Sequence, residues 1–384
     1  DATGLPVTDA LATILAAARA GVPVLIADPA GPRETADAAA SAPPGTFLIA
    51  VTSGTSGRPR PVLRTAASWT SSFSPLAELA GLSAQDRVLL TGPLHATMHL
   101  FAAVHTLWLG AELTDRPDHA TAVHAVPAVL ADLLAALSPT APLRTAVVAG
   151  SALPVRVADD AAARGVAVTE YYGAAELSFV AAARHAGALR PFPGADVQLR
   201  DGEIWVRSPY LASGYASGVI GPLRRDQAGY ATVGDLGEWL DGGGLRVRGR
   251  GDAAITTGGA TVIAEDIEAA LCTLPGVRAA AVVGVPHRRL GEVVAAVIEP
   301  TGIEPTGIER AADDSAEARN LDGIRSAARL VLHGPSLPRR WFTVRRLPRT
   351  GNGKIARALV GDAVLRAVAG DGPPAGGPQL RPLP

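Results

Sequence analysis

Cysteine is almost absent from the 384-residue chain, which contains only Cys272. A single thiol excludes an internal disulfide framework and a metal site built from cysteine alone. No uninterrupted apolar run reaches the roughly 18 residues that a membrane-spanning helix needs. The net charge of −1 gives no electrostatic attraction to nucleic acid or to an anionic membrane surface. We therefore expect neither nucleic acid nor a membrane as a partner.

Lysine is the other near-absence, because Lys354 is the only lysine among 35 basic residues. An ammonium is a compact point charge on a flexible stem, whereas a guanidinium is a planar fork. Arginine therefore cannot replace lysine where one small cation must reach a reacting oxygen. Gly351 and Gly353 allow a flexible or positive-φ approach beside it. These features favour Lys354 as a catalytic residue, and a surface lysine retained by chance is the alternative.

The chain begins at Asp1, with neither an initiator methionine nor a charged-then-apolar leader. This start is typical of a fragment of a cytoplasmic protein rather than of an export precursor, so we expect a cytoplasmic location. With a mass of 39.0 kDa and 48% hydrophobic residues, the chain can bury a large core and is long enough for two domains.

Short β-rich runs alternate with longer helical patterns through the first two thirds of the chain. The strand candidates are residues 22–27, 46–51, 87–90, 145–149 and 166–171. The helix candidates are residues 66–80, 98–109, 127–137 and 155–164. This alternation predicts an α/β fold with mostly parallel strands.

The pattern changes at about Ala195 to β-runs joined by glycine turns, and Asp241-Gly242 between two such runs predicts a hairpin. Residues after Gly251 predict a small α+β domain that contains an amphipathic helix with Ile263, Ile267, Leu271 and Leu274 on one face. We therefore divide the chain into an N-terminal domain (1–250) with mostly parallel sheets and a β-rich subdomain, a mobile C-terminal domain (251–368), and a disordered Gly/Pro-rich tail (369–384).

A glycine/hydroxyl loop follows an apolar strand candidate and consists of Thr52, Ser53, Gly54, Thr55, Ser56 and Gly57. Hydroxyls, backbone N–H groups and glycines at this density suit the binding of a polyphosphate. No lysine follows the second glycine, so the loop does not match the P-loop of nucleoside triphosphatases. Taken alone, such a run is more often an ordinary flexible loop.

Further motifs follow this loop in a fixed order: Tyr172-Gly173-Ala174-Ala175-Glu176, Gly234-Asp235, Gly249 to Glu268, and Pro348 to Arg357. The ordered set resembles the adenylate-forming superfamily, which includes acyl-CoA and aryl-CoA synthetases, nonribosomal-peptide adenylation domains and luciferases. The resemblance extends from about Val51 to Arg357. It implies an ATP-dependent acid–thiol ligase with a large N-terminal domain and a small mobile lid domain.

The chain departs from the family pattern in several motifs. Arg60 and Pro61 stand where lysine and glycine are usual, and Val233 replaces the threonine of T-G-D. Ala175 replaces a threonine that is expected to touch phosphate or magnesium. The Lys354 segment matches P-x-T-x-x-G-K-I-x-R without departure. The departures leave open a degenerate protein that binds a nucleotide or an acyl group without catalysis.

The resemblance implies roles in the activation of a carboxylate by ATP. The glycine/hydroxyl loop would hold the leaving phosphates, and Glu176 would carry Mg²⁺, which prefers oxygen ligands. Lys354 would bridge the carboxylate and the α-phosphate, where negative charges meet. Glu176 considered alone is more often a solvated acid.

Other residues would bind the adenosine part of ATP. Tyr172 would lie on the adenine ring, and Gly150, Ser151 and Ala152 would form the other wall. Asp235 would accept hydrogen bonds from the ribose hydroxyls, with Arg250 as a donor beside it. Taken singly, Tyr172 is more often a core aromatic residue and Asp235 a turn residue.

His95 stands where the family usually places an aromatic residue or histidine between the acyl pocket and the thiol channel. The resemblance therefore implies substrate binding, and a core histidine is the alternative. The wall of the acyl pocket is predicted to be small and apolar, with no arginine for a second carboxylate, from Ala96, Met98, Val148, Gly150 and Gly173. A small-to-medium apolar or aromatic acid fits such a wall best.

Thioester formation is the second reaction that the resemblance implies. Gly258 and Gly259 are similar to the acyl-CoA synthetase loop in which missing side chains leave a tunnel for pantetheine. We therefore expect ATP, Mg²⁺ and coenzyme A as cofactors, with the phosphopantetheine of an acyl carrier protein as the alternative acceptor. Asp252 matches the hinge residue about which the small domain turns in the family.

Overall fold

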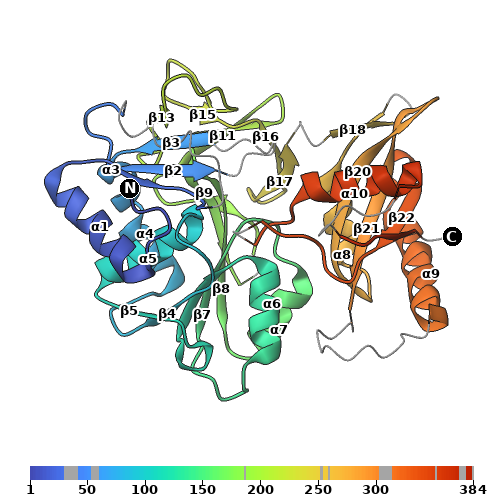
Figure 1. Cartoon of the computed structure of the whole chain (residues 1–384), viewed down its shortest axis with the longest axis horizontal. Helices are drawn as coiled ribbons and strands as arrows, with labels where there is room; N and C mark the ends of the chain where they lie inside the picture. Colours follow the sequence, from blue (N-terminus) through green and yellow to red (C-terminus); the bar gives the residue numbers. More distant parts are fainter. Residues whose placement is uncertain are drawn as a thin grey trace. The chain divides into compact units, whose positions relative to one another are not determined.

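The computed structural model describes residues 1–29, 42–52, 60–185, 187–250, 254–257, 260–301, 314–350, 353–371 and 378–382 (Figure 1). The chain divides into two compact units. The first contains Asp1–Val247 together with Gly351–Lys354, and the second contains Arg248–Thr350 together with Ile355–Pro384. The domain boundary expected at residues 250 and 251 stays a prediction and lies close to this division.

The largest sheet of the first unit has seven strands in the order β10-β9-β8-β7-β6-β4-β5. Strands β5, β4, β6, β7 and β8 pair in parallel, and β9 and β10 are antiparallel to their neighbours. Their bounds are β4 Arg87–Leu90, β5 Glu112–Thr114, β6 Ala122–Ala125, β7 Thr145–Val148, β8 Ala167–Ala174, β9 Ser178–Arg184 and β10 Arg190–Pro191. The α/β fold class with mostly parallel strands is confirmed.

Helices cover both faces of this sheet, because alternate residues of a strand point to opposite sides. In β7, Ala146 and Val148 belong to the apolar cluster formed with α6 (Pro127–Ala136) and α7 (Val155–Ala163). Val147 belongs to the cluster on the other face, formed with α4 (Phe73–Ala80) and α5 (Thr97–Leu109). All four residues of β7 are buried, which explains why three of them are apolar and why the Thr145 hydroxyl donates to the Ala80 carbonyl at 2.9 Å.

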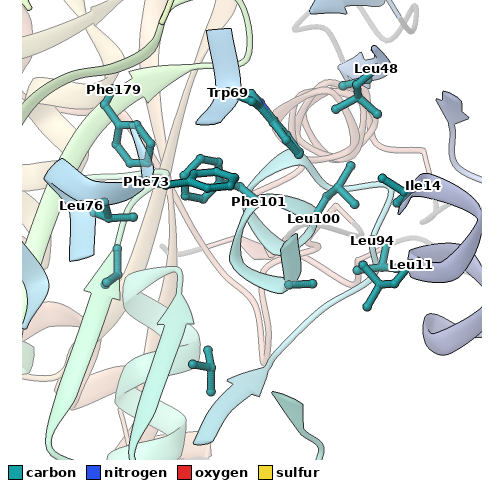
Figure 2. Packing of buried hydrophobic residues seen from close by; sticks show 14 of the residues in the cluster. Leu11, Ile14, Leu48, Trp69, Phe73, Leu76, Leu94, Leu100, Phe101 and Phe179 are labelled. Carbon is teal, nitrogen blue, oxygen red and sulfur yellow. The ribbon is translucent and has the colours of Figure 1, made fainter. Parts of the chain in front are cut away.

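Aromatic residues gather in one part of this core although they make up only 4% of the sequence. Figure 2 shows Trp69, Phe73, Phe101 and Phe179 close together. The ring centroids of Phe73 and Phe101 are 5.2 Å apart, and those of Phe101 and Phe179 are 5.0 Å apart, both with edge-to-face geometry. Aromatic pairs prefer this edge-to-face geometry, and the contacts join α4 and α5 to β9.

The single helix predicted over residues 66–80 is wrong, because the structure forms α3 (Ala66–Thr70) and α4 with Ser71 and Ser72 between them. In a continuous helix, Pro75 would lack the N–H that bonds the carbonyl of Ser71, and its ring would clash with that carbonyl. The Thr65 hydroxyl accepts a hydrogen bond from the Ser68 N–H and starts α3.

A second sheet of the first unit has the order β1-β2-β3-β13. Its strands are β1 Val24–Ile26, β2 Leu48–Thr52, β3 Arg60–Arg64 and β13 Gly214–Tyr215, and α1 (Val7–Ala20) precedes them. Thr52 is opposite Arg60 in the antiparallel pair of β2 and β3. The glycine/hydroxyl loop therefore connects the ends of two adjacent strands.

A six-stranded sheet follows along the chain, with the path β14-β15-β12-β16-β17 and with β11 beside β12. The bounds are β11 Asp196–Arg200, β12 Glu203–Arg207, β14 Arg224–Arg225, β15 Ala231–Thr232, β16 Asp235–Trp239 and β17 Leu245–Arg250. Gly242 has φ of 86°, and the Leu240 N–H donates to the Gly244 carbonyl at 2.7 Å. The hairpin predicted at Asp241-Gly242 is confirmed.

The second unit contains a sheet with the path β19-β18-β21-β22-β23 and with β20 beside β21. The bounds are β18 Ala254–Thr257, β19 Ala260–Ile263, α8 Ala264–Cys272, β20 Val277–His287, β21 Gly291–Pro300, α9 Asp314–Val331, β22 Arg340–Thr343, α10 Arg357–Ala369 and β23 Arg381–Pro382. Short 3₁₀ helices are formed by Pro117–His119 and Gly334–Ser336. The predicted amphipathic helix is confirmed as α8, with Ile267 and Leu271 buried. Ile263 and Leu274 were expected on the same face, but Ile263 ends β19 and Leu274 follows the helix.

The disorder expected for residues 369–384 does not extend to residues 381–382. These two residues form β23, which pairs with Phe342 and Thr343 of β22. The reason is that an edge strand presents unpaired N–H and C=O groups, which a passing segment can bond. In the part of the chain that the structure describes, no helix has the length and apolar character required to cross a membrane.

Candidate functional site

The carboxyl ends of the parallel strands β7 and β8 bring several predicted site residues to one edge of the seven-stranded sheet. Residues 150–152 follow β7, and Tyr172 and Gly173 lie near the end of β8. Val148 of β7 pairs with Glu170 of β8. If this register continued by two residues, residue 150 would be opposite Tyr172. In open α/β sheets, ligands usually bind outside the carboxyl ends of the strands.

The loop formed by residues 150–152 is exposed and is held where it ends. The Leu153 N–H donates to Oε1 of Glu170 at 2.9 Å. Burial raises the pKa of Glu170, and this hydrogen bond opposes the shift. Gly150 has φ of 99°, a conformation that favours glycine.

Tyr172 and Asp235, predicted to contact adenine and ribose, are hydrogen-bonded to each other. The Tyr172 hydroxyl donates to Oδ2 of Asp235 at 2.6 Å. Asp235 begins β16 and is 7% exposed, so the carboxylate is held close to the phenol. Gly234 has φ of 83° and sets the direction of the chain into β16. The bond brings the two residues together, and their contacts with a nucleotide stay predictions.

Gly173 lies at an irregularity in the pairing of β8 with β9. A Cβ added at Gly173 would be 2.0 Å from the carbonyl oxygen of Ser178, so only glycine fits there. Such bulges are common next to active sites, where they redirect side chains. Here the bulge comes just before the turn that carries Glu176.

Glu176, the predicted metal ligand, is buried in the turn between β8 and β9. Its Oε1 accepts a hydrogen bond from the Tyr215 hydroxyl at 2.8 Å, and its backbone carbonyl accepts one from the Ala212 N–H at 2.9 Å. Burial and then the charge of Glu176 raise the pKa of Tyr215 well above its ordinary value, so the phenol stays a donor.

Arg64 is a residue of this site that the sequence reasoning missed. It is 1% exposed, and its Nη1 donates to the carbonyl of Ala175 at 2.5 Å. Burial lowers the pKa of Arg64 to about 9, and the charge of Glu176 opposes this shift. The guanidinium is therefore charged at neutral pH. The available signal was an arginine directly after the apolar pair Val62-Leu63, a few residues beyond the glycine/hydroxyl loop.

Gly353 and Lys354 group with the first unit. A Cβ added at Gly150 would lie 3.2 Å from Cε of Lys354, so the lysine side chain passes over the loop after β7. A Cβ added at Gly353 would lie 2.9 Å from Cγ2 of Val126, which follows β6, and Gly353 has φ of 79°. The positive φ favours glycine at both positions, and at Gly353 a side chain would also clash with Val126.

His95, predicted to contact the substrate, lies between β4 and α5, and its Nε2 is 3.8 Å from Oδ2 of Asp28. Three nearby histidines are buried: His99, His105 and His124. Burial lowers their pKa values to about 4, 4 and 3, respectively, so all three are neutral at pH 7. These three are core residues, and the role of His95 stays a prediction.

A pH-dependent loss of stability is expected from these buried histidines. The folded pKa of His105 is about 4 against an ordinary 6.5, so the unfolded chain binds the proton first as the pH falls. The contribution of His105 to the free energy of unfolding is fully present above pH 6.5 and is progressively lost as the pH falls to about 4. When the pH falls from 7 to 5, the free energy of unfolding of wild type should therefore fall by about 2 kcal/mol more than that of His105→Phe.

Urea denaturation at the two pH values measures this difference. The His105 ring packs against Phe73 and Trp108, a position that a phenylalanine ring can occupy. The substitution removes the hydrogen bond between Nε2 of His105 and the Phe73 carbonyl at 3.0 Å, and comparison within each variant removes this constant effect. An equal loss in both proteins would mean that His105 is protonated in the folded state.

Other predicted site residues lie outside the described residues: Ser53, Gly54, Thr55, Ser56, Gly57, Asp252, Gly258 and Gly259. The backbones of Thr52 and Arg250 belong to β2 and β17, and their side chains are likewise outside the description. The roles assigned to all of these residues stay predictions.

The donor set around Glu176 fits magnesium rather than a metal held by protein alone. Among the described residues, no group of three or more His, Cys, Asp and Glu side chains is arranged to hold a metal ion. Mg²⁺ usually takes one or two carboxylates, with substrate phosphates and waters as its other ligands. The single buried carboxylate of Glu176 suits that coordination.

Comparison with protein-family models gives two matches. Residues 6–216 match the model of the AMP-binding enzyme, and residues 266–354 match that of the AMP-binding enzyme C-terminal domain. The chain belongs to the AMP-binding enzyme family. The resemblance to the adenylate-forming superfamily, of the acyl-CoA or aryl-CoA synthetase type, is thereby confirmed.

Curated relatives of this AMP-binding enzyme are CoA ligases. The chain is 31% identical over 347 residues to the probable 2-succinylbenzoate–CoA ligase of Mycobacterium tuberculosis, which covers 84% of this chain and 85% of the relative. It is 29% identical over 353 residues to the uncharacterized acyl-CoA ligase YhfT of Bacillus subtilis, which covers 83% of this chain and 68% of the relative. The interpretation as an ATP-dependent acid–thiol ligase is confirmed.

A solved structure has the same fold. A variant of E. coli MenE with bound OSB-AMS superposes with a TM-score of 0.76 at 23% identity, over 95% of this chain and 87% of that chain. At that identity the likeness establishes the fold alone. It agrees with the α/β N-terminal part and the separate C-terminal part described above.

Proposed function

We propose that this AMP-binding enzyme activates a small-to-medium apolar or aromatic carboxylic acid with ATP and Mg²⁺ and then transfers the acyl group to coenzyme A. The first reaction gives acyl-AMP and pyrophosphate, and the second gives the thioester and AMP. The family match supports the reaction type. The proposed substrate class, metal and acyl acceptor need support from the residues of the site.

The observation that carries the proposal is the gathering of three predicted elements at the carboxyl ends of β7 and β8. The side chain of Lys354 passes over Gly150, and the Tyr172–Asp235 hydrogen bond lies at the end of the next strand. Lys354 is the only lysine in the chain. A lone ammonium beside a candidate nucleoside site is what a reaction between two anions requires.

In the first reaction, a carboxylate oxygen attacks the α-phosphorus as the bond to the oxygen bridging to the β-phosphate breaks and pyrophosphate leaves. Lys354 would balance the charge on the attacking oxygen and the α-phosphate. Tyr172 and Asp235 would hold the adenosine, and residues 52–57 would hold the leaving phosphates. Glu176 would hold Mg²⁺, which neutralises phosphate charge when bound.

In the second reaction, a thiolate attacks the acyl carbonyl carbon, and AMP leaves with the bonding electrons. Gly258 and Gly259 would leave room for pantetheine beside the acyl group. Coenzyme A is the proposed acceptor because the relatives quoted above carry CoA ligase in their names. The phosphopantetheine of an acyl carrier protein is the alternative, since the same arm would pass through the same space.

The substrate class rests on the residues expected at the acyl pocket. Ala96 is small and buried, and Gly173 cannot carry a side chain. Apolar walls of this kind favour an apolar chain or ring over a second carboxylate, which would need a paired cation. The relative named for 2-succinylbenzoate makes that dicarboxylate the informative comparison.

Pyrophosphate release with a panel of acids tests this proposal. Benzoate and hexanoate should give a higher kcat/KM for pyrophosphate release than 2-succinylbenzoate. Coenzyme A should accelerate turnover more than a purified phosphopantetheinylated carrier protein. Preference for 2-succinylbenzoate would overturn the substrate class alone. Turnover only with carrier protein would overturn the acceptor, and no release with any acid would overturn the function.

A further inference from the structure

Arg64 is the fully buried cation of the first unit that no family motif quoted above includes. It ends β3, the strand that leaves the glycine/hydroxyl loop, and it is 1% exposed. Burying a guanidinium is unfavourable unless its donors find acceptors. Its hydrogen-bond partners therefore indicate what it does in the fold.

These partners are backbone carbonyls from three separate segments. Nη1 donates to Ala175 at 2.5 Å, and Nη2 donates to Ser68 at 3.2 Å and to Tyr210. Ala175 lies next to Glu176 in the turn between β8 and β9. One guanidinium thus joins β3, α3, the Glu176 turn and the segment after β12.

The segment after β12 holds Glu176 from its other side. The Ala212 N–H donates to the Glu176 carbonyl, and the Tyr215 hydroxyl donates to its carboxylate. Tyr210, bonded by Arg64, lies two residues before Ala212. Arg64 therefore holds both the turn that carries Glu176 and the segment that bonds it.

The arrangement is poorly explained by stability alone. Nε of Arg64 is buried and has no hydrogen-bond partner among the described residues, and burial lowers the pKa of the side chain. A buried donor without a partner costs about 1–3 kcal/mol. Apolar residues often replace buried charges without loss of stability, so a geometric role is the better explanation for this arginine.

We propose that Arg64 is a positioning residue that fixes the Ala175–Glu176 turn, so that the Glu176 carboxylate is ordered before a magnesium-bound nucleotide arrives. The role of Glu176 toward magnesium rests on the proposed function. The planar fork of a guanidinium donates to several carbonyls in a set geometry, whereas an ammonium does not reproduce that geometry.

Amide hydrogen exchange tests the positioning role without any activity. In Arg64→Lys, exchange of amides in residues 174–177 should rise at least about fivefold over wild type, while amides of β6 and β7 keep their protection. Arg144→Lys is the matched control, since Arg144 pairs with the buried Asp86 at 2.5 Å beside the start of β7. It should leave residues 174–177 unchanged.

Arg64→Met, of similar length and apolar, is the second variant, and it should also loosen residues 174–177. Unchanged exchange there, or an equal rise through the whole unit, would overturn the proposal. Failure of both Arg64 variants to fold while Arg144→Lys folds would also overturn it, because Arg64 would then be a general structural residue.

A magnesium titration connects the position to the reaction. The Mg²⁺ concentration for half-maximal pyrophosphate release should rise about fivefold in Arg64→Lys, equivalent to about 1 kcal/mol, and stay unchanged in Arg144→Lys. Binding of ATP with Mn²⁺ as a spectroscopic probe should weaken by the same factor. Loosened exchange without any change in metal dependence would overturn the link to magnesium. An inactive wild type would count against the proposed function, and exchange and Mn²⁺ binding would still decide the role of Arg64.

Discussion

Lys354→Ala is expected to lower acyl-AMP formation by a factor on the order of 100 or more, because loss of a preorganised charge contact typically has that effect. The substitution removes the only ammonium side chain in the protein, and Lys354 lies against Gly150 at the carboxyl end of β7. Two anions, the carboxylate and the α-phosphate, would then approach without a cation between them. Single-turnover pyrophosphate release measures the effect.

Two further variants make the test specific to the ammonium. Lys354→Arg should recover little activity, because the planar guanidinium differs in shape and hydration from the ammonium. Arg345→Ala removes an exposed cation from the segment that follows β22, nine residues before Lys354 in the sequence, and should leave the rate near wild type. Near-normal adenylation by Lys354→Ala would remove the lysine from the reaction.

The sequence predicted most of the fold because its signals are local. Each parallel strand expected in the first unit overlaps an observed one, since strands buried on both faces are rich in apolar residues. The hairpin at Asp241-Gly242 follows from glycine at positive φ. The break between α3 and α4 was also readable, because Pro75 cannot lie inside a continuous helix.

The site was only partly predictable because its contacts join distant segments. Tyr172 and Asp235 are 63 residues apart, and Arg64 and Ala175 are 111 residues apart. No periodicity or spacing along the chain encodes such pairs, which depend on how β3, β8 and β16 are arranged in three dimensions. The ordered motifs named Tyr172 and Asp235, and the bond between them appears only in the folded structure.

Asp252→Pro is expected to separate the two half-reactions. Asp252, which lies outside the described residues, comes shortly after the division between the units at Val247 and Arg248. Lys354 is proposed to act in adenylation and Gly258-Gly259 in thiol entry, so one fixed arrangement would have to serve both. Domain rotations concentrate their φ and ψ changes in a few residues at a boundary.

Proline fixes φ near −65° and should hold the boundary in one arrangement. Acyl-AMP should still form, while thioester formation falls by on the order of tenfold or more, about 1.4 kcal/mol of barrier. Pyrophosphate release in a single turnover reports the first reaction, and thioester yield from preformed acyl-AMP reports the second. Asp252→Ala, which leaves φ free, is the matched control and should retain most of both activities. Equal losses in the two assays would make Asp252 structural, and undiminished activity in both would place the hinge elsewhere in the chain.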